Sequence, residues 1–300
     1  MKLIVSGNKY SDIDVLACSV ALKNIYDLQK IDALICISEN FNESITPKLK
    51  QLVSGLSFIP DEMPRVYEVT VVDISDPEHI DKRINQGNIT EVFDHHFGYE
   101  ELWKGRLGDK SRIVEIGACA TLIWEYVKSL NLQNSLSHST KQLLAAAIVS
   151  NTLNFNASVT KEADKAAFQY LGFDGAFIQE YFSDVEKYIM LNPEQAIKSS
   201  IKHQTISGVE YAMAQIELWD SREFLQKNTE VVSKILNGKS CLMWFYTSPS
   251  ISEGKNYIYT EVAEAKEVLA RVLEVKFDGN VGQTNKLWLR KEIIRKLIDS

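Results

Sequence analysis

The feature that most constrains the fold is an alternation, in the first half of the chain, between short β-branched apolar runs and segments with helical spacing. The apolar runs are residues 3–5, 33–37, 69–74 and 91–93. Residues 15–26 follow the first run and place Leu16, Val20 and Ile25 at helical spacing. Such alternation is typical of βαβ units, and it predicts a mainly parallel sheet.

The pattern continues through the rest of the chain, with a break near Pro193 that follows a helical stretch. The further elements that we expect are helices at 118–130, 141–149, 221–236 and 263–273, strands at 211–216 and 241–246, and a basic amphipathic segment at 289–298. A chain of 300 residues is long enough for two domains. The sequence therefore predicts an α/β protein whose N-terminal domain, residues 1–188, has a mainly parallel sheet and whose smaller α/β C-terminal domain spans residues 196–300.

The composition and net charge limit the kinds of molecule that the chain is expected to bind. Hydrophobic residues make up 45% and charged residues 24%, which is ordinary for a globular protein. The net charge of -7 argues against a general nucleic-acid binder, although local cations or a metal still permit a phosphate substrate. The first apolar run is too short for a signal peptide, and no run approaches the ~18 residues of a membrane span. We therefore expect a cytoplasmic protein with neither a membrane nor a nucleic-acid partner.

Polar residues follow several of these elements at their ends, where open α/β sheets bind ligands. They are Asn8, Asp12 and Asp14 after the first strand, Asp73 after the third, Asp94, His95 and His96 after the fourth, and Ser150 and Asn151 after the helix at 141–149. Carboxylates are hard ligands for Mg²⁺ or Mn²⁺, and an imidazole favours Mn²⁺. Crowded carboxylates repel one another unless cations lie between them. The convergence predicts a site for paired metal ions that act on a phosphoryl group.

Each residue alone also has an ordinary structural explanation. Asp12 and Asp14 are typical helix N-caps or turn residues, and Asp73 is a typical strand-end residue. The adjacent His95 and His96 are harder to dismiss because the chain has only five histidines. The other histidines, for which we expect surface or core positions, are His79, His138 and His203.

Several of these segments resemble the motifs of one family, in order. Residues 94–96, Asp-His-His, resemble the signature of the DHH phosphoesterases. Residues 7–14 resemble the first motif, 72–73 the second and 150–153 the fourth, and residues 115–121 resemble the Val-Gly-x-Thr-Ala-Thr segment of the family. The resemblance implies a two-domain α/β fold and metal-dependent phosphoester or phosphoanhydride chemistry.

The second half of the chain indicates the subfamily. Lys202, six residues before Gly208, resembles the substrate lysine of manganese-dependent (family II) inorganic pyrophosphatases. Residues 288–291, Trp-Leu-Arg-Lys, resemble their C-terminal Ser-Arg-Lys-Lys segment, although Arg290 and Lys291 also fit the solvated face of a terminal helix. Exopolyphosphatases share this plan. The branch that cleaves oligonucleotides and cyclic dinucleotides carries a Gly-Gly-Gly-His motif, which this sequence lacks.

The resemblance assigns roles by position. The implied metal ligands are Asn8, Asp12, Asp14, Asp73, His95 and Asn151. The implied substrate contacts are His96, Lys202, Arg290 and Lys291, with His96 and Asp14 as catalytic residues. Two ions, Mn²⁺ or Mg²⁺, are implied, with the second domain closing over the site.

Two residues depart from the pyrophosphatase pattern. Asn8 stands where those enzymes have a metal-binding His, and Asn151 stands where they have a metal-binding Asp. Asn151 keeps a carbonyl oxygen but removes a full charge, so we expect one ion to bind weakly. Gly-Asn in the first motif also resembles the exopolyphosphatase branch.

Three functions remain open at this point: hydrolysis of pyrophosphate, which we favour, hydrolysis of polyphosphate ends, and binding of a phosphate-bearing ligand without turnover. Each implies a small phosphate compound as partner, and a homodimer is compatible with all three.

Overall fold

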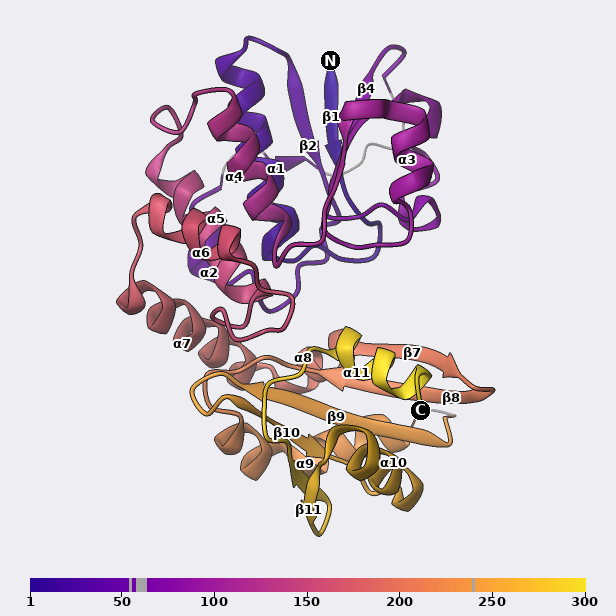
Figure 1. The fold of residues 1–300 in the computed structure, drawn as a ribbon. Coiled ribbons are helices and arrows are strands. Elements are labelled where there is room, and N and C mark those ends of the chain that lie inside the picture. Colours follow the sequence, from indigo (N-terminus) through magenta and orange to yellow (C-terminus); the bar gives the residue numbers. More distant parts are fainter. Residues whose placement is uncertain (54–55, 58–63, 239–240) are drawn as a thin grey trace. The chain divides into compact units, whose positions relative to one another are not determined.

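The computed structural model describes residues 1–53, 56–57, 64–238 and 241–300, and the chain divides into two compact units (Figure 1). Unit 1 comprises Met1–Phe155 and Val159–Ile178, and unit 2 comprises Asn156–Ser158 and Gln179–Ser300. Helix α7 (Gly175–Leu191) crosses the boundary between them. Pro193 is the first residue of helix α8 (Pro193–Ser200), so the sequence break at this proline is a junction between two helices.

Unit 1 is built on a parallel sheet with strand order β3-β2-β1-β4-β5-β6. Its strands are β1 (Lys2–Val5), β2 (Ala33–Cys36), β3 (Leu56–Ser57), β4 (Glu68–Val72), β5 (Ile89–Asp94) and β6 (Ser111–Ile113). The expected apolar runs form β1, β2, β4 and β5, and their buried residues fill the core. The predicted parallel α/β sheet is confirmed.

The helices of unit 1 are α1 (Ile13–Leu28), α2 (Pro47–Lys50), α3 (Glu100–Leu107), α4 (Cys119–Ser129), α5 (His138–Asn151) and α6 (Glu162–Leu171). Short 3-10 turns occupy Pro77–His79, Gln86–Asn88 and Gly108–Lys110. Helix α1 packs against both α4 and α5, which explains why its sequence is apolar on nearly all sides. In Figure 1, α1 and α4 lie to the left of the strands and α3 lies to their right.

Unit 2 contains a mixed sheet with strand order β11-β12-β10-β9-β8-β7, in which β8 and β9 are parallel and the other pairs are antiparallel. Its strands are β7 (Ile201–Ile206), β8 (Val209–Gln215), β9 (Met243–Ser250), β10 (Lys255–Tyr259), β11 (Lys276–Asp278) and β12 (Val281–Gln283). Ser207 and Gly208 join β7 to β8 with φ values of 50° and 80°. This left-handed pair is the conformation of a tight hairpin turn, and Gly208 adopts it without strain.

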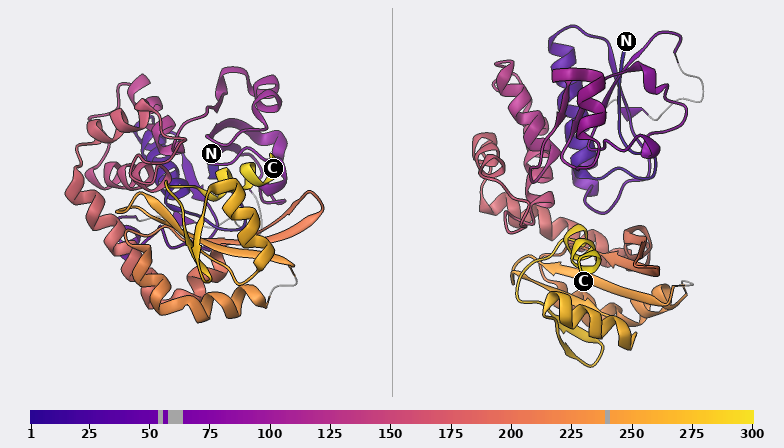
Figure 2. Two further views of the ribbon diagram at one scale, coloured as in Figure 1. Left: turned by 60° about the horizontal axis from the view of Figure 1, so that its bottom comes forward. Right: turned by 45° about the vertical axis from the view of Figure 1, so that its right-hand side comes forward.

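The helices of unit 2, besides α8, are α9 (Ser221–Asn237), α10 (Ala263–Leu273) and α11 (Arg290–Ile298). Helices α10 and α11 bury apolar side chains with Met213, Phe245 and Ile258 of the sheet. Helix α9 instead contacts Trp244, whose Nε1 donates to Asn237 Oδ1 at 2.9 Å. Figure 2 shows α10 and α11 of this unit from two further directions. Within the described residues, no helix has the length and apolarity needed to cross a bilayer.

Candidate metal centre

Asp73 lies where the chain leaves β4. Its φ of 56° is left-handed, a conformation that Asp and Asn tolerate better than most residues. Its backbone N–H donates to Phe93 O of the neighbouring strand at 2.8 Å, which fixes the turn. The side chain is only 6% exposed. The sheet thus delivers a buried carboxylate to the end of its central strands.

His95 follows β5 and faces Asp73. Its Nδ1 lies 3.0 Å from Ile116 O, and a carbonyl oxygen only accepts, so Nδ1 carries the proton in this contact. The other ring nitrogen, Nε2, lies 3.4 Å from Asp73 Oδ1, and the His95 side chain is 3% exposed. A backbone contact that fixes one nitrogen and points the other at a carboxylate is typical of a metal-binding histidine.

Asp94 turns inward and orients His96. Its Oδ1 accepts hydrogen bonds from the backbone N–H of His95 at 2.8 Å and of His96 at 3.1 Å, and lies 2.8 Å from His96 Nδ1. Burial on its own raises the pKa of Asp94, but the hydrogen bond and charge of His96 outweigh it and hold this pKa below its usual range. The His96 ring is half exposed and leaves Nε2 available to a ligand. One ligand atom each from Asp73, His95 and His96 lie within 4.8 Å of one another.

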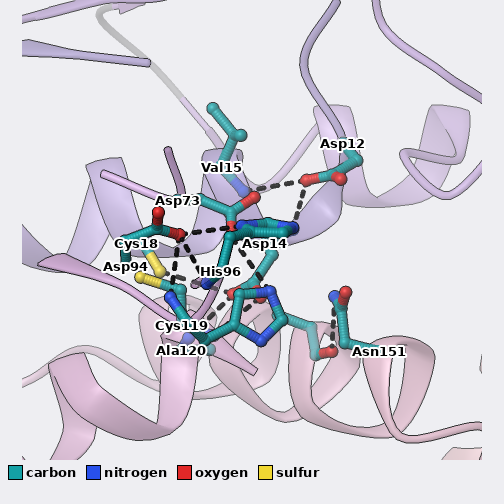
Figure 3. Close-up of polar contacts among 12 residues, drawn as sticks. Asp12, Asp14, Val15, Cys18, Asp73, Asp94, His96, Cys119, Ala120 and Asn151 are labelled. Carbon is teal, nitrogen blue, oxygen red and sulfur yellow. Dashed lines mark hydrogen bonds and ion pairs between the residues drawn. The ribbon is translucent and has the colours of Figure 1, made fainter. Parts of the chain in front are cut away.

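Asp12 and Asp14 lie at the start of helix α1, as predicted, but their side chains make different contacts. Asp12 is the N-cap, and its Oδ1 accepts from the backbone N–H of Asp14 and of the next residue, both at 3.0 Å. Asp14 is fully buried and reaches another helix, α4. Its Oδ2 accepts from Cys119 N at 2.8 Å, and its Oδ1 accepts from Ala120 N at 2.7 Å (Figure 3). Asp14 thus caps α4, whose positive N-terminal end favours the carboxylate.

The carboxylates crowd one another. Burial, and next the charge of Asp73, raise the pKa of Asp14 from 3.8 to about 7, with a smaller contribution from Asp12. The positive charge of His95 and the N–H of Ala120 act in the opposite direction. A cation among these oxygens would remove the repulsion. The ligand atoms that already lie together are one carboxylate oxygen and two imidazole nitrogens, from Asp73, His95 and His96, and imidazole nitrogen favours Mn²⁺ over Mg²⁺. The residues therefore fit a metal ion.

The two asparagines occupy different surroundings. Asn151 is the last residue of α5 and half buried, and its Nδ2 donates to Ala147 O at 3.2 Å (Figure 3). Its amide oxygen is therefore the atom left for a ligand. Asn8 lies in the exposed segment after β1, where its backbone N–H donates to His79 O at 3.0 Å.

Besides Asp14, a second carboxylate, Asp164, supports the start of α4. Its Oδ2 accepts from Gly117 N at 3.0 Å and Lys161 N at 2.8 Å, and its Oδ1 accepts from Thr121 Oγ1 at 2.6 Å. A Cβ atom on Gly117 would lie 2.5 Å from Thr152 Cγ2 and 2.6 Å from Asp164 Oδ2. Only glycine fits this close approach. The segment at 115–121 resembles a family motif, but nothing in the sequence connects it to Asp164.

Unit 2 contains the predicted substrate residues Lys202, Arg290 and Lys291, and it brings Lys202 and Arg290 to one face of its sheet. Lys202 lies in β7 opposite Met213, which packs in the core under α10 and α11. Cross-strand partners share a face, so the exposed Lys202 lies on the face that carries α11. Arg290 is the first residue of α11, and its Nη1 donates to the carbonyl of Ser200, two residues before Lys202.

The basic residues of α11 lie at opposite ends of the helix. Arg290 and Lys291 occupy the first turn, where the positive end of the helix dipole disfavours cations. Arg295 and Lys296 occupy the last turn, where the dipole favours them. The helix dipole therefore favours Arg295 and Lys296 but does not account for Arg290 and Lys291, of which Lys291 is exposed. Two cations beside helix N-terminal amides form a surface that attracts anions.

Asn256, which sequence inspection did not single out, fixes the segment that leads into α11. It is fully buried, and its Nδ2 donates to Trp288 O at 2.8 Å and Thr247 Oγ1 at 2.9 Å. Its Oδ1 accepts from Trp288 N at 2.8 Å. This clamp sets where the first turn of α11 begins.

The chain is similar in sequence to known proteins over nearly its whole length. No protein-family model matches it. It is 23% identical over 299 residues to the manganese-dependent inorganic pyrophosphatase of Methanocaldococcus jannaschii, and the match covers 92% of this chain and 91% of that protein. It is 20% identical over 317 residues to a probable manganese-dependent inorganic pyrophosphatase of Lactobacillus helveticus, covering 100% and 98%.

Solved structures show the same relationship at the level of the fold. A putative family II inorganic pyrophosphatase of Methanococcus jannaschii superposes with a TM-score of 0.69 at 20% identity, covering 100% of this chain and 99% of that one. An exopolyphosphatase-related protein of Bacteroides fragilis superposes with a TM-score of 0.51 at 14% identity, covering 98% and 89%. The chain therefore resembles manganese-dependent (family II) inorganic pyrophosphatases over nearly its whole length, in both sequence and fold.

Proposed function

We propose that the protein is a metal-dependent hydrolase of phosphoanhydride bonds and that its substrate is inorganic pyrophosphate. The observation that carries the proposal is the buried contact between His95 and Asp73 beside Asp14, a carboxylate whose pKa is raised by burial and by its acidic neighbour. Relatives named as manganese-dependent pyrophosphatases over nearly the full chain support the choice of substrate.

The proposed metal ligands are Asp12, Asp14, Asp73 and His95, with weaker contributions from Asn8 and Asn151. Manganese is the first choice because an imidazole joins the carboxylates and because the relatives carry manganese in their names. Bound there, such ions neutralise phosphoryl charge and lower the pKa of water.

The side chains of unit 1 supply proton chemistry. His96 is held at Nδ1 by the ionised Asp94, so its half-exposed Nε2 can donate to the oxygen of the leaving phosphate. Asp14 is fully buried beside Asp73, and its proposed catalytic role is that of a ligand that helps to hold the ion that would activate water. Asp94 acts through His96 and is a positioning residue.

The cations of unit 2 are proposed to bind the substrate phosphates. Arg290 offers a planar fork that matches phosphate oxygens, while Lys202 and Lys291 act as point charges. We accordingly propose residues 1–188 as the catalytic domain and 196–300 as the substrate-binding domain. We expect the reaction to take place in the cytoplasm.

Hydrolysis of polyphosphate ends is the second candidate. Gly7-Asn8 replaces the Gly-His of pyrophosphatases, as in the exopolyphosphatase branch, and the fold is also that of an exopolyphosphatase-related protein.

Phosphate release from pyrophosphate and from long-chain polyphosphate, each with Mn²⁺ and then Mg²⁺, separates the candidates. Faster turnover of pyrophosphate supports the first proposal, and faster turnover of polyphosphate selects the second. Release from neither substrate overturns both and leaves a phosphate-binding protein, which equilibrium binding of pyrophosphate would then detect.

A further inference from the structure

A second group of metal-ligating side chains lies in unit 2 and takes no part in the proposed hydrolysis. His203 of β7, Glu210 of β8 and Cys241, two residues before β9, each offer one ligand atom, and these atoms lie within 4.8 Å of one another. Two neighbouring strands of one hairpin and a third segment further along the chain thus converge on one point at the β7 edge of the sheet.

The register of the hairpin explains why two of them meet. His203 pairs with Ala212, and Glu210 pairs with Thr205. Residues two apart on a strand share a face, so His203 and Glu210 are diagonal neighbours on the same face. Lys202 lies on the opposite face of the same strand, so this group is separate from the cations proposed to bind phosphate.

The distances have the scale of a coordination sphere. His203 Nδ1 lies 3.4 Å from Cys241 Sγ and 3.5 Å from Glu210 Oε1. Zinc binds sulfur at about 2.3 Å and nitrogen or oxygen at about 2.0–2.2 Å, which places tetrahedral ligands roughly 3.3–3.6 Å apart. Two edges of such a tetrahedron are therefore already formed around the imidazole nitrogen.

The donor chemistry separates this group from an ordinary surface ion pair. An exposed His–Glu pair contributes little to stability and does not require a thiol beside it. Here Cys241 is 9% exposed, while His203 and Glu210 reach solvent, so a cation can enter and keep an open position. Sulfur with nitrogen and one carboxylate favours Zn²⁺ over the harder Mn²⁺ and Mg²⁺.

We propose that His203, Glu210 and Cys241 form a binding site for a Zn²⁺-type transition metal, with a solvent-facing fourth position. On binding, the Cys241 thiol releases its proton to solvent and ligates as a thiolate, with no change of oxidation state. The imidazole ligates through Nδ1 and keeps its proton on Nε2. The ion would join the edge strand β7 to β8 and to the start of β9, and so stabilise the edge of the sheet.

Cobalt is the probe, because thiolate-to-Co²⁺ charge transfer absorbs in the near ultraviolet and oxygen or nitrogen ligands do not produce that band. Metal-free full-length protein is titrated with Co²⁺ and then with Zn²⁺. We expect the band to saturate at the amplitude of one thiolate-bound Co²⁺ per chain, whatever further Co²⁺ the unit 1 centre takes up without producing the band, and to disappear as Zn²⁺ displaces Co²⁺. Cys241→Ser should abolish the band, and His203→Gln and Glu210→Gln should each weaken Co²⁺ binding at least 10-fold.

Asp73→Asn is the matched control, because it removes a ligand of the unit 1 centre and should leave the band intact. Absence of the band in the wild-type protein, or its retention in Cys241→Ser, overturns the proposal. Both of these outcomes are independent of the proposed hydrolysis, because Cys241 is not part of the unit 1 centre. Phosphate release by Cys241→Ser, measured separately, should equal that of the wild type.

Discussion

Replacing Asp73 by Asn tests whether the acidic cluster is built for a cation. Asparagine is nearly isosteric with aspartate and tolerates the left-handed φ of 56°, whereas alanine would add backbone strain. The change removes one charge from the cluster and keeps an oxygen that can face His95. We therefore expect two opposite effects: loss of metal binding and hydrolysis, and a more stable metal-free protein.

The size of the stability effect follows from the neighbouring carboxylate. Raising the pKa of Asp14 from 3.8 to about 7 makes its ionised form less favourable by about 4 kcal/mol in the folded state. Burial is the largest cause and Asp73 the second. Asp73→Asn should therefore raise the free energy of unfolding of the metal-free protein by less than half of this amount, about 1–2 kcal/mol.

The sign of the pH dependence is fixed by the direction of the shift. A carboxyl group whose folded-state pKa is raised binds protons more tightly in the folded state than in the unfolded state. The penalty is absent below about pH 3.8, grows as the pH rises, and is complete above about pH 7. Metal-free Asp73→Asn should thus exceed the wild type in stability above pH 7, and the difference should vanish near pH 4.

Urea unfolding of chelator-treated protein at both pH values measures this difference, and calorimetric titration with Mn²⁺ measures binding. Equal or lower stability of Asp73→Asn above pH 7 would refute the argument from repulsion. Undiminished Mn²⁺ affinity would refute the assignment of Asp73 as a ligand.

Three other predictions concern separate parts of the chain. Lys202→Ala and Arg290→Ala should each lower kcat/KM for pyrophosphate roughly 10–150-fold, which corresponds to about 1.5–3 kcal/mol. Calorimetric Mn²⁺ binding should stay unchanged in both variants. If both keep the kcat/KM of the wild type, unit 2 does not bind the substrate phosphates. Gly117→Ala should lower the free energy of unfolding by about 1–3 kcal/mol, because the new Cβ would overlap the side chains of Thr152 and Asp164. The control Gly105→Ala, in open space on α3, should not lower it. Equal denaturation midpoints for Gly117→Ala and the wild type would contradict the close packing around Gly117. Asn151→Asp should raise Mn²⁺ affinity because it restores a negative charge. It should also lower the free energy of unfolding of the metal-free protein by about 1 kcal/mol, because a carboxylate cannot donate the hydrogen bond that Asn151 gives to Ala147 O. Unchanged calorimetric binding would place residue 151 outside the metal shell.

Much of the fold was predictable because its signals are local. The buried strands β1, β4 and β5 are apolar runs, and α9 and α10 have their buried residues at helical spacing. Strand β7 was not predicted, because its Ile-Lys-His-Gln-Thr-Ile sequence is polar and its pairing with β8 depends on the hairpin. Edge strands of this kind owe their structure to a partner strand more than to their own composition.

In the candidate metal centre, too, some contacts could be predicted from the sequence and others could not. Asp73, His95 and His96 follow strand ends in the sequence, so parallel topology alone predicts that they meet. The capping of α4 by Asp14 and the support from Asp164 join residues more than 40 positions apart through backbone amides. Such contacts depend on how helices pack, and residue type gives no signal for them.

The most direct test of the central claim is phosphate release from pyrophosphate by the purified full-length chain, before and after removal of metal and then with added Mn²⁺. The proposed function predicts turnover with Mn²⁺, loss of turnover with chelator, recovery on re-addition, and none from Asp73→Asn under any condition. Turnover that persists in Asp73→Asn, or no release by the wild type with either Mn²⁺ or Mg²⁺, would contradict a hydrolytic metal centre at the ends of β4 and β5.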